Sequence, residues 1–170
     1  MVKILETERL LLRQIDDEDA ELLVELLNEP AFLRHIGDRG VRNAEDARKY
    51  IADGPVASYR KFGFGLYLVE LKGSGESIGI CGLLKRESLE DPDIGYAFLS
   101  KYRSKGFAQE AGSAVLDYGR KVLSLKRIVA LTAPDNDASI HVLEKIGLRY
   151  EKMVRLKGAK RDSKLFASEV

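Results

Sequence analysis

The chain has 170 residues, of which 45% are hydrophobic and 32% are charged, and its formal net charge is +1. This length favours a single domain over residues 1–170, and the near-neutral charge gives no reason to expect bulk attraction to nucleic acid or to a membrane surface. One cysteine excludes an internal disulfide framework, and no apolar run reaches the roughly 18 residues of a membrane-spanning helix. Because the charged N-terminus also lacks a signal-peptide core, we expect a cytoplasmic protein.

The first half of the chain predicts a strand, two helical regions and a hairpin. Near-alternating leucines indicate the strand, and Asp16 and Asn43 are typical N-caps for the two helices. Glycines between two apolar runs indicate a hairpin turn rather than a dinucleotide-binding loop, because a strand and not a helix follows them. The predicted elements are a strand over 4–15, helices over 17–29 and 44–60, and strands over 64–71 and 77–84 joined by a turn at 72–76.

The second half predicts alternating strands and helices, followed by a last hairpin. Asp135, Asn136 and Asp137 are candidate caps of a short helix, which Gly147 ends as a C′ glycine. The predicted elements are strands over 94–99 and 126–133, helices over 106–123 and 137–146, and hairpin strands over 149–157 and 163–168. This mixture of strands and helices predicts one layered domain of the α+β or α/β class.

Metal and thiol chemistry have little support in the sequence. His35 and His141 lie far apart and lack metal-ligand spacing, so no metal site is expected. Cys81 lies in the middle of an apolar strand, where a buried structural thiol is the expected role. No Walker-type phosphate loop is present, which removes nucleotide hydrolysis from the candidate activities.

Charge is distributed unevenly along the chain. Acidic residues dominate 16–29, and basic residues dominate 149–164. A solvated helix face and an exposed hairpin explain both runs. The alternative roles are an acidic lip that attracts a cationic acceptor and a basic flank that attracts phosphates.

Residues 101–111, KYRSKGFAQEA, join the strand over 94–99 to the helix over 106–123. This order of strand, basic loop, glycine and helix places free backbone N–H groups and the positive end of a helix dipole beside the loop. Gly106 lets a phosphate approach the backbone closely, and Arg103 and Lys105 add positive charge. The stretch from Arg103 to Ala108 therefore predicts an anion-binding site.

A second motif, NDASIHVLEKIGL from Asn136 to Leu148, follows its own predicted strand. Together with the R-x-x-G-x-A pattern at 103–108, it resembles the two cofactor motifs of the GNAT superfamily of acyl-CoA N-acyltransferases. The order of predicted elements along the whole chain is similar to that fold as well. The opening LETERLLLR at 5–13 and the triplet IGY at 94–96 resemble the RimJ/RimL-type branch, which acetylates protein N-termini and other amines.

The resemblance implies a fold and a cosubstrate. The fold is a central mixed, mostly antiparallel sheet that splays between two parallel strands, with helices on both faces. The cosubstrate is acetyl-CoA, lying between the strands over 94–99 and 126–133. The implied pyrophosphate contacts are Arg103, Ser104, Lys105, Gly106, Phe107 and Ala108, and the implied pantetheine contacts are the backbone of Phe98 and Leu99 together with Asn136 and Ser139.

Acyl transfer needs a neutral amine, a stabilised oxyanion and a proton or hydrogen bond for the departing thiolate. Many members of the family use a tyrosine of the last helix for the thiolate, and this sequence has Leu143 at that position. Analogy with the RimL-type branch implies Ser139 in this role, and a helix-capping serine is the alternative. Asp93, at the start of the strand over 94–99, is the candidate general base, with Glu87 or water as its rivals. A solvated turn carboxylate is the alternative role of both acids.

The motifs together predict an N-acetyltransferase that moves an acetyl group from acetyl-CoA to a primary amine by direct attack in a ternary complex. The acceptor is either a protein N-terminus or a small molecule, and the expected assembly is a monomer or homodimer without nucleic-acid or membrane partners. A non-catalytic acyl-CoA-binding module of the same fold is the alternative, because it needs the cofactor motifs but neither acid nor base. Nucleic-acid binding by the basic tail has weak support, since few aromatic residues are interleaved there.

Overall fold

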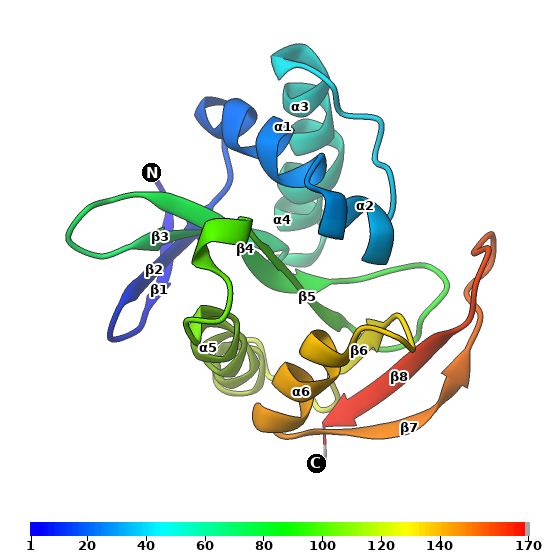
Figure 1. Cartoon of the computed structure of the whole chain (residues 1–170). Coiled ribbons are helices and arrows are strands. Elements are labelled where there is room, and N and C mark those ends of the chain that lie inside the picture. The colour runs from blue at the N-terminus through cyan, green and yellow to red at the C-terminus, as the bar shows by residue number, and fades with distance from the viewer. Residues whose placement is uncertain (169–170) are drawn as a thin grey trace.

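A computed structural model describes residues 1–168 and arranges them around one eight-stranded sheet with helices against both faces (Figure 1). The strands are β1 (Lys3–Glu6), β2 (Leu10–Gln14), β3 (Leu66–Leu71), β4 (Ser77–Leu84), β5 (Asp93–Phe98), β6 (Val129–Thr132), β7 (Leu148–Val154) and β8 (Ser163–Ser168). The helical segments are η1 (Asp17–Asp19), α1 (Ala20–Leu27), α2 (Pro30–His35), α3 (Ala44–Ile51), η2 (Ala52–Val56), α4 (Ala57–Phe62), η3 (Ser100–Tyr102), α5 (Phe107–Lys121) and α6 (Asp137–Lys145). Within this range, no helix combines the length and apolarity that a membrane crossing requires.

The sheet has the strand order β1-β2-β3-β4-β5-β6-β8-β7, and β5 and β6 form its parallel pair. These two strands pair at one position, Asp93 opposite Val129. At the same end, the Val129 N–H donates to the carbonyl of Pro92 at 3.0 Å. The two parallel strands are therefore joined at their first residues and separate beyond them, which confirms the predicted sheet that is mostly antiparallel and splays at its centre.

Period-two alternation sends the side chains of each strand into two different hydrophobic layers. On one face, α1 and α3 pack against β3 and β4, and Leu23, Ile51 and Leu68 are among the buried side chains. On the other face, α5 and α6 cover the sheet, with Val115 and Leu143 buried beneath them. Figure 1 shows α1–α4 on one side of the sheet and α5 and α6 on the other. The sheet thus separates the layer of α1–α4 from the layer of α5 and α6.

The structure corrects the predicted single strand over 4–15. Thr7, Glu8 and Arg9 instead form the turn between β1 and β2. The Thr7 N–H donates to the carbonyl of Leu10 at 2.9 Å, and the Leu10 N–H donates to Thr7 Oγ1 at 3.0 Å. The turn forms because the threonine hydroxyl accepts a backbone N–H that an extended strand would have left to a neighbouring strand.

The helices before β3 also differ from the prediction. The first helix ends before Pro30 as expected, but Pro30 itself begins α2, where its missing N–H has no helical partner to lose. The region over 44–60 contains α3 and α4 joined by the π-helical segment η2, which accommodates Pro55. The two predicted helices are therefore divided: α2 begins at Pro30 as a helix of its own, and the π-helical segment η2 lies between α3 and α4.

Local signals gave the remaining elements correctly. The turn at 72–76 joins β3 to β4, with the Gly75 N–H donating to the carbonyl of Leu71 at 2.9 Å. The side chains of Asn43 and Asn136 cap α3 and α6. Cys81 is fully buried in β4, as the sequence predicts.

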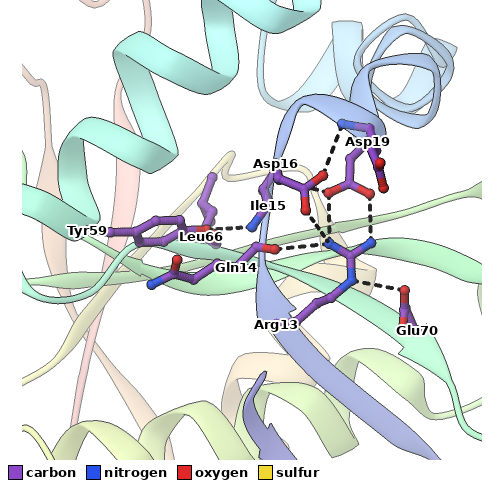
Figure 2. Close-up of polar contacts among 9 residues, drawn as sticks. Arg13, Gln14, Ile15, Asp16, Asp19, Tyr59, Leu66 and Glu70 are labelled. Carbon is purple, nitrogen blue, oxygen red and sulfur yellow. Dashed lines mark hydrogen bonds and ion pairs between the residues drawn. The ribbon is translucent and has the colours of Figure 1, made fainter. Parts of the chain in front are cut away.

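A buried ion cluster attaches β2 to the start of the helical layer (Figure 2). The Arg13 guanidinium donates to the two carboxylate oxygens of Asp19 at 2.9 and 2.7 Å, and its Nε donates to Glu70 at 3.0 Å. Beside it, the Ile15 N–H donates to Tyr59 Oη at 3.0 Å. Arg13 is 8% exposed and Asp19 is 6% exposed. The cluster therefore joins β2, η1 and β3 as part of the scaffold.

Candidate functional site

The loop between β5 and α5, residues 99–106, ends in two left-handed backbone conformations. Ser104 has φ 61° and Gly106 has φ 84°. Gly106 is the N-cap of the 15-residue helix α5, and among residues 1–168 no side chain accepts a hydrogen bond from the first turn of that helix. The first-turn N–H groups of α5 are thus left for another acceptor, in the positive field of the helix dipole. This geometry suits a bound anion.

Glycine is favoured at position 106 chiefly by the backbone conformation, and the neighbouring end of the Arg9 side chain adds a minor constraint. A φ of +84° is costly for a residue that has a Cβ atom. A Cβ built on Gly106 would also lie 3.3 Å from Arg9 Nη2. Ser104, Lys105 and Gly106 are exposed, Ala108 is half-buried, and Phe107 is buried. The predicted anion-binding residues therefore form one continuous surface loop that leads into a buried helical turn.

Arg103 is held along the end of β5 rather than extended into solvent. Its Nε donates to the carbonyl of Phe98 at 3.1 Å, and its Nη2 donates to Glu29 Oε1 at 2.7 Å. Glu29, between α1 and α2, also accepts the Ser100 N–H at 3.0 Å. Arg103 thus fastens the loop to the helices on the opposite face of the sheet, an arrangement that the sequence does not predict.

Arg9 supports the same loop from the β1–β2 turn. Its guanidinium lies 4.4 Å from the centre of the Phe107 ring, its Nη1 donates to the carbonyl of Lys105 at 3.0 Å, and its Nε donates to Glu110 at 2.7 Å. Burial raises the pKa of Glu110, but hydrogen bonds from Thr7 and Arg9 outweigh it and leave the pKa lowered. The sequence singled out this arginine only as part of the opening motif.

Beyond the pairing of Asp93 with Val129, β5 and β6 separate and leave an opening, and the edge of β5 that faces it carries backbone groups outside the β4 ladder, among which the Phe98 carbonyl accepts from Arg103. The Leu99 N–H donates to the carbonyl of Ile78 at 2.9 Å, on the β4 side. Because hydrogen-bonded positions alternate along an antiparallel pair, the backbone groups of Tyr96 and Phe98 point to the β6 side. The position of Phe98 agrees with a contact to a ligand in the opening, whereas the Leu99 N–H is engaged within the sheet.

Ser139 and Asn136 lie at the start of α6, on the other side of this opening. The Ser139 N–H donates to Asn136 Oδ1 at 3.2 Å, so the asparagine caps the helix. Ser139 Oγ lies 3.0 Å from the hydroxyl oxygen of Tyr96 on β5. Burial raises the pKa of Tyr96 to about 12. The sequence did not identify Tyr96 as a site residue, because alternation along β5 places it on the face opposite to Asp93 and its contact with Ser139 joins segments 43 residues apart.

Asp93 lies at the point where β5 and β6 join and is 1% exposed. Its carboxylate accepts from Arg86 Nε at 3.0 Å. Burial raises the pKa of Asp93, and the neighbouring Arg86 offsets part of that rise. The rival base, Glu87, is exposed in the loop between β4 and β5.

Asp93 and Ser139 lie on opposite faces of β5. Gly95, two residues from Asp93, faces the α1–α4 side, because a Cβ built there would lie 3.3 Å from Leu84. Ile94 faces the other side, against α5, and Tyr96 shares its phase. The structure therefore does not bring the two candidate catalytic residues together.

Two surface hollows lie away from these groups. One of about 400 Å³ is lined by α3 and the loop before it, including Arg39, Lys49 and Tyr50, and another lies beside η1. Neither includes a predicted site residue. Between residues 1 and 168, no group of three or more His, Cys, Asp or Glu side chains is placed to hold a metal ion. The candidate site is thus defined by backbone geometry and hydrogen bonds.

Comparison with curated proteins gives close matches in length. The chain is 32% identical over 145 residues to a protein of Bacillus subtilis (strain 168), "Uncharacterized N-acetyltransferase YnaD", and the match covers 85% of this chain and 82% of that protein. A solved acetyltransferase of the GNAT family from Bacillus anthracis is 30% identical, with a TM-score of 0.79, and 98% of this chain and 97% of that chain are covered. Both matches span nearly the whole molecule.

A further solved structure and a family model agree with these matches. RimJ of Mycobacterium smegmatis, in complex with CoA-disulfide, is 24% identical with a TM-score of 0.78, covering 93% of this chain and 80% of that chain, and shares its fold. The family model of the acetyltransferase (GNAT) domain matches residues 9–149, a range that holds the whole candidate site. The chain belongs to the GNAT acetyltransferase family.

Proposed function

We propose that the protein is an N-acetyltransferase that moves an acetyl group from acetyl-CoA to a primary amine by direct attack in a ternary complex. The observation that carries this proposal is the start of α5, where Gly106 leaves the first-turn N–H groups without a side-chain cap beside the opening between β5 and β6. Such a helix end suits the diphosphate of a coenzyme. Family membership supplies acetyl transfer as the class of reaction.

The residues of the loop fit a diphosphate in charge and in donors. The backbone N–H groups at 104–108 supply the donors, and the exposed Lys105 supplies charge. Arg103 has five N–H donors, of which Phe98 and Glu29 occupy two in the hydrogen bonds described above. The remaining donors of Arg103 are free to reach the same anion.

The edge of β5 fits the amides of the pantetheine arm. The backbone groups of Tyr96 and Phe98 face the opening, so we assign the strand-like contacts to these two residues in preference to Leu99. From the other side, the side-chain N–H₂ of Asn136 supplies donors, because only its oxygen is used to cap α6. A ligand arm held at both edges would bring its thioester near the start of α6.

The separation of Asp93 and Ser139 suits direct attack. The amine nitrogen must lose a proton while the sulfur leaves from the same carbon, and the two events need different partners. Asp93, at the closed end of the opening on the α1–α4 face, is the proposed base; because it is 1% exposed, it is proposed to take the proton through a water chain, and burial raises its pKa. Ser139 is the proposed hydrogen-bond donor to the sulfur. The demand on the base is greater for an alkyl amine, with a pKa of about 10, than for a protein N-terminus, with a pKa of about 8.

An acyl-cysteine intermediate has no support in this geometry. Cys81 is completely buried in β4, and burial raises the pKa of its thiol. A nucleophilic cysteine needs a thiolate and access to its substrate. The acceptor is therefore proposed to attack the thioester itself, and it is either a protein N-terminus or a small-molecule amine.

The test is release of free thiol from acetyl-CoA in the presence of a panel of small-molecule amines and peptides with free N-termini. Thiol release that depends on both acetyl-CoA and one class of amine, with acetylated product detected by mass spectrometry, is the expected result. Saturable binding of acetyl-CoA without thiol release across the panel would instead support a non-catalytic acyl-CoA-binding module. Absence of binding would contradict the cosubstrate itself.

A further inference from the structure

Two hydroxyl groups meet across the opening between β5 and β6. Tyr96 belongs to β5, and Ser139 belongs to the first turn of α6, the helix that follows β6 along the chain. Tyr96 Oη lies 3.0 Å from Ser139 Oγ and 3.4 Å from the Ser139 carbonyl oxygen. This contact bridges the two arms of the opening in which the proposed thioester would lie.

The chemistry of the two groups favours one direction for the hydrogen bond. A phenol, with a pKa of about 10, is a better donor than the alcohol of serine. Serine oxygen carries one hydrogen and two lone pairs, so a bond donated by Tyr96 leaves the Ser139 hydrogen to be donated elsewhere. The backbone that carries this hydroxyl is fixed, because the Ser139 N–H is bonded to Asn136.

The surroundings keep Tyr96 protonated. Burial raises its pKa to about 12, although its hydrogen bond with Ser139 acts in the opposite direction. Cys81 of β4 also raises the pKa of Tyr96, and burial raises the pKa of that thiol as well. A free thiol has a pKa of about 8.5, so transfer of the Tyr96 proton to a thiolate is unfavourable by about three orders of magnitude. The pair can therefore donate hydrogen bonds but is a poor source of protons.

We propose that Tyr96 is a positioning residue for acyl transfer, which orients the Ser139 hydroxyl toward the sulfur of coenzyme A. This inference rests on the proposed function and adds a residue to its site. In the reaction, the amine nitrogen bonds to the thioester carbon, the C–S bond breaks, and its electron pair leaves on sulfur. Ser139 donates a hydrogen bond to the resulting thiolate, while the proton of the amine goes to Asp93 or to water.

The experiment measures the pKa of the thiol of bound coenzyme A, from the ultraviolet absorbance of its thiolate at a series of pH values. This reading needs no acceptor amine. In the wild type, the Ser139 hydrogen bond lowers that pKa. Ser139→Ala is expected to reduce the acid dissociation constant of the thiol by about 10- to 100-fold, because a hydrogen bond to a charged group is lost. Tyr96→Phe keeps the ring and is expected to reduce it by about two- to tenfold.

The double variant Tyr96→Phe/Ser139→Ala distinguishes a positioning role from an independent one. If Tyr96 acts through Ser139, the double variant matches Ser139→Ala. Additive changes, or an unchanged thiol pKa in Tyr96→Phe, would overturn the inference. Ser139→Thr, which keeps a hydroxyl, is expected to restore most of the wild-type value.

Controls separate this inference from folding and from the proposed function. Tyr150→Phe removes an exposed tyrosine hydroxyl from β7 and is expected to leave the pKa of the coenzyme A thiol unchanged. Thermal unfolding of each variant detects a loss of structure, and Ser139→Ala with Ser139→Thr still tests the hydrogen bond if Tyr96→Phe does not fold. If coenzyme A binds the wild type but the pKa of its thiol is unshifted, only the proposed role of Tyr96 and Ser139 is contradicted. Failure of the wild type to bind coenzyme A would contradict the proposed function, and the inference with it.

Discussion

Two arginine clusters of this protein differ in how far their charges are enclosed. The side chain of Arg13 is 10% exposed and its guanidinium is bonded to Asp19 and Glu70, within the scaffold. At the loop before α5, the side chains of Arg9 and Arg103 are 43% and 40% exposed, although each is also bonded to a glutamate. An enclosed ion has lost its hydration permanently, so removing one partner leaves the other uncompensated. A half-exposed arginine retains water-facing donors, so its removal is expected to affect ligand binding more than folding.

Arg13→Leu gives the largest expected effect, because it leaves Asp19 and Glu70 without their cation in a buried site. We expect the free energy of unfolding to fall by about 3–5 kcal/mol, as measured by urea denaturation monitored by circular dichroism. Arg155→Leu is the matched control, since Arg155 and Asp162 form an ion pair with side chains 60% and 50% exposed, and no measurable change is expected there. A loss of less than about 1 kcal/mol for Arg13→Leu would remove the distinction between the clusters.

Gly106→Val tests the loop itself. The Cβ atom conflicts with the positive φ and stands beside the proposed diphosphate site, so the affinity for acetyl-CoA is expected to fall at least about tenfold. Gly158→Val is a close control, because Gly158 has the same φ of +84° with no heavy atom within 4 Å of its built Cβ. Calorimetric titration of both variants separates loss of binding from backbone strain. Equal affinities in the two variants would place the anion elsewhere.

Arg103→Gln is expected to weaken acetyl-CoA binding about three- to tenfold, since one half-exposed charged donor is lost. The loss should shrink at high salt, because screening already weakens the wild-type contact. The unfolding temperature is expected to change little, in contrast to Arg13→Leu. Arg120→Gln, on the exposed end of α5, is the control. An Arg103→Gln variant that loses stability instead of affinity would assign this arginine to the scaffold.

The features that the sequence could predict are those that depend on residues close together along the chain. Asn43, Asn136 and the glycines of the turn at 72–76 act on backbone groups a few residues away, so their roles follow from local pattern. The chain order of elements and the Arg103–Ala108 loop were predictable for the same reason. Local signals also failed at Thr7, where a single hydroxyl closed a turn inside an otherwise strand-like run, and at Pro30 and Pro55, where helical segments begin or change type.

Contacts between distant segments could not be predicted from one sequence. Glu29 and Arg103 are 74 residues apart, and Arg9 and Glu110 are 101 apart. A carboxylate and a guanidinium attract each other in many pairings, and only the packed fold selects one. The meeting of Tyr96 with another segment depends equally on how α6 lies beside β5. The sequence therefore identified the loop but not the side chains that hold it.

Asp93 sharpens the comparison, because it combines features of both clusters. Its side chain is 2% exposed, as in the scaffold, but its ion-pair partner Arg86 is 37% exposed, as at the loop. Burial raises the pKa of Asp93 and Arg86 offsets part of the rise. If Asp93 is the base, the acid limb of the kcat/KM profile lies above the ordinary aspartate pKa of about 3.9. Arg86→Gln removes the offset, so the limb is expected to move to higher pH with an unchanged plateau.

The pH dependence of the free energy of unfolding is expected to follow from the same raised pKa of Asp93. A native pKa above the unfolded value means that the native state binds the proton more tightly. The contribution of Asp93 is then fully present below the unfolded pKa and is lost as pH rises through the native pKa, and Arg86→Gln extends this loss to higher pH. Arg127→Gln, which breaks the comparable ion pair with Asp91, should shift neither profile. Movement of the acid limb to lower pH in Arg86→Gln would show that Asp93 is not the titrating base, and Glu87 or water would take its place.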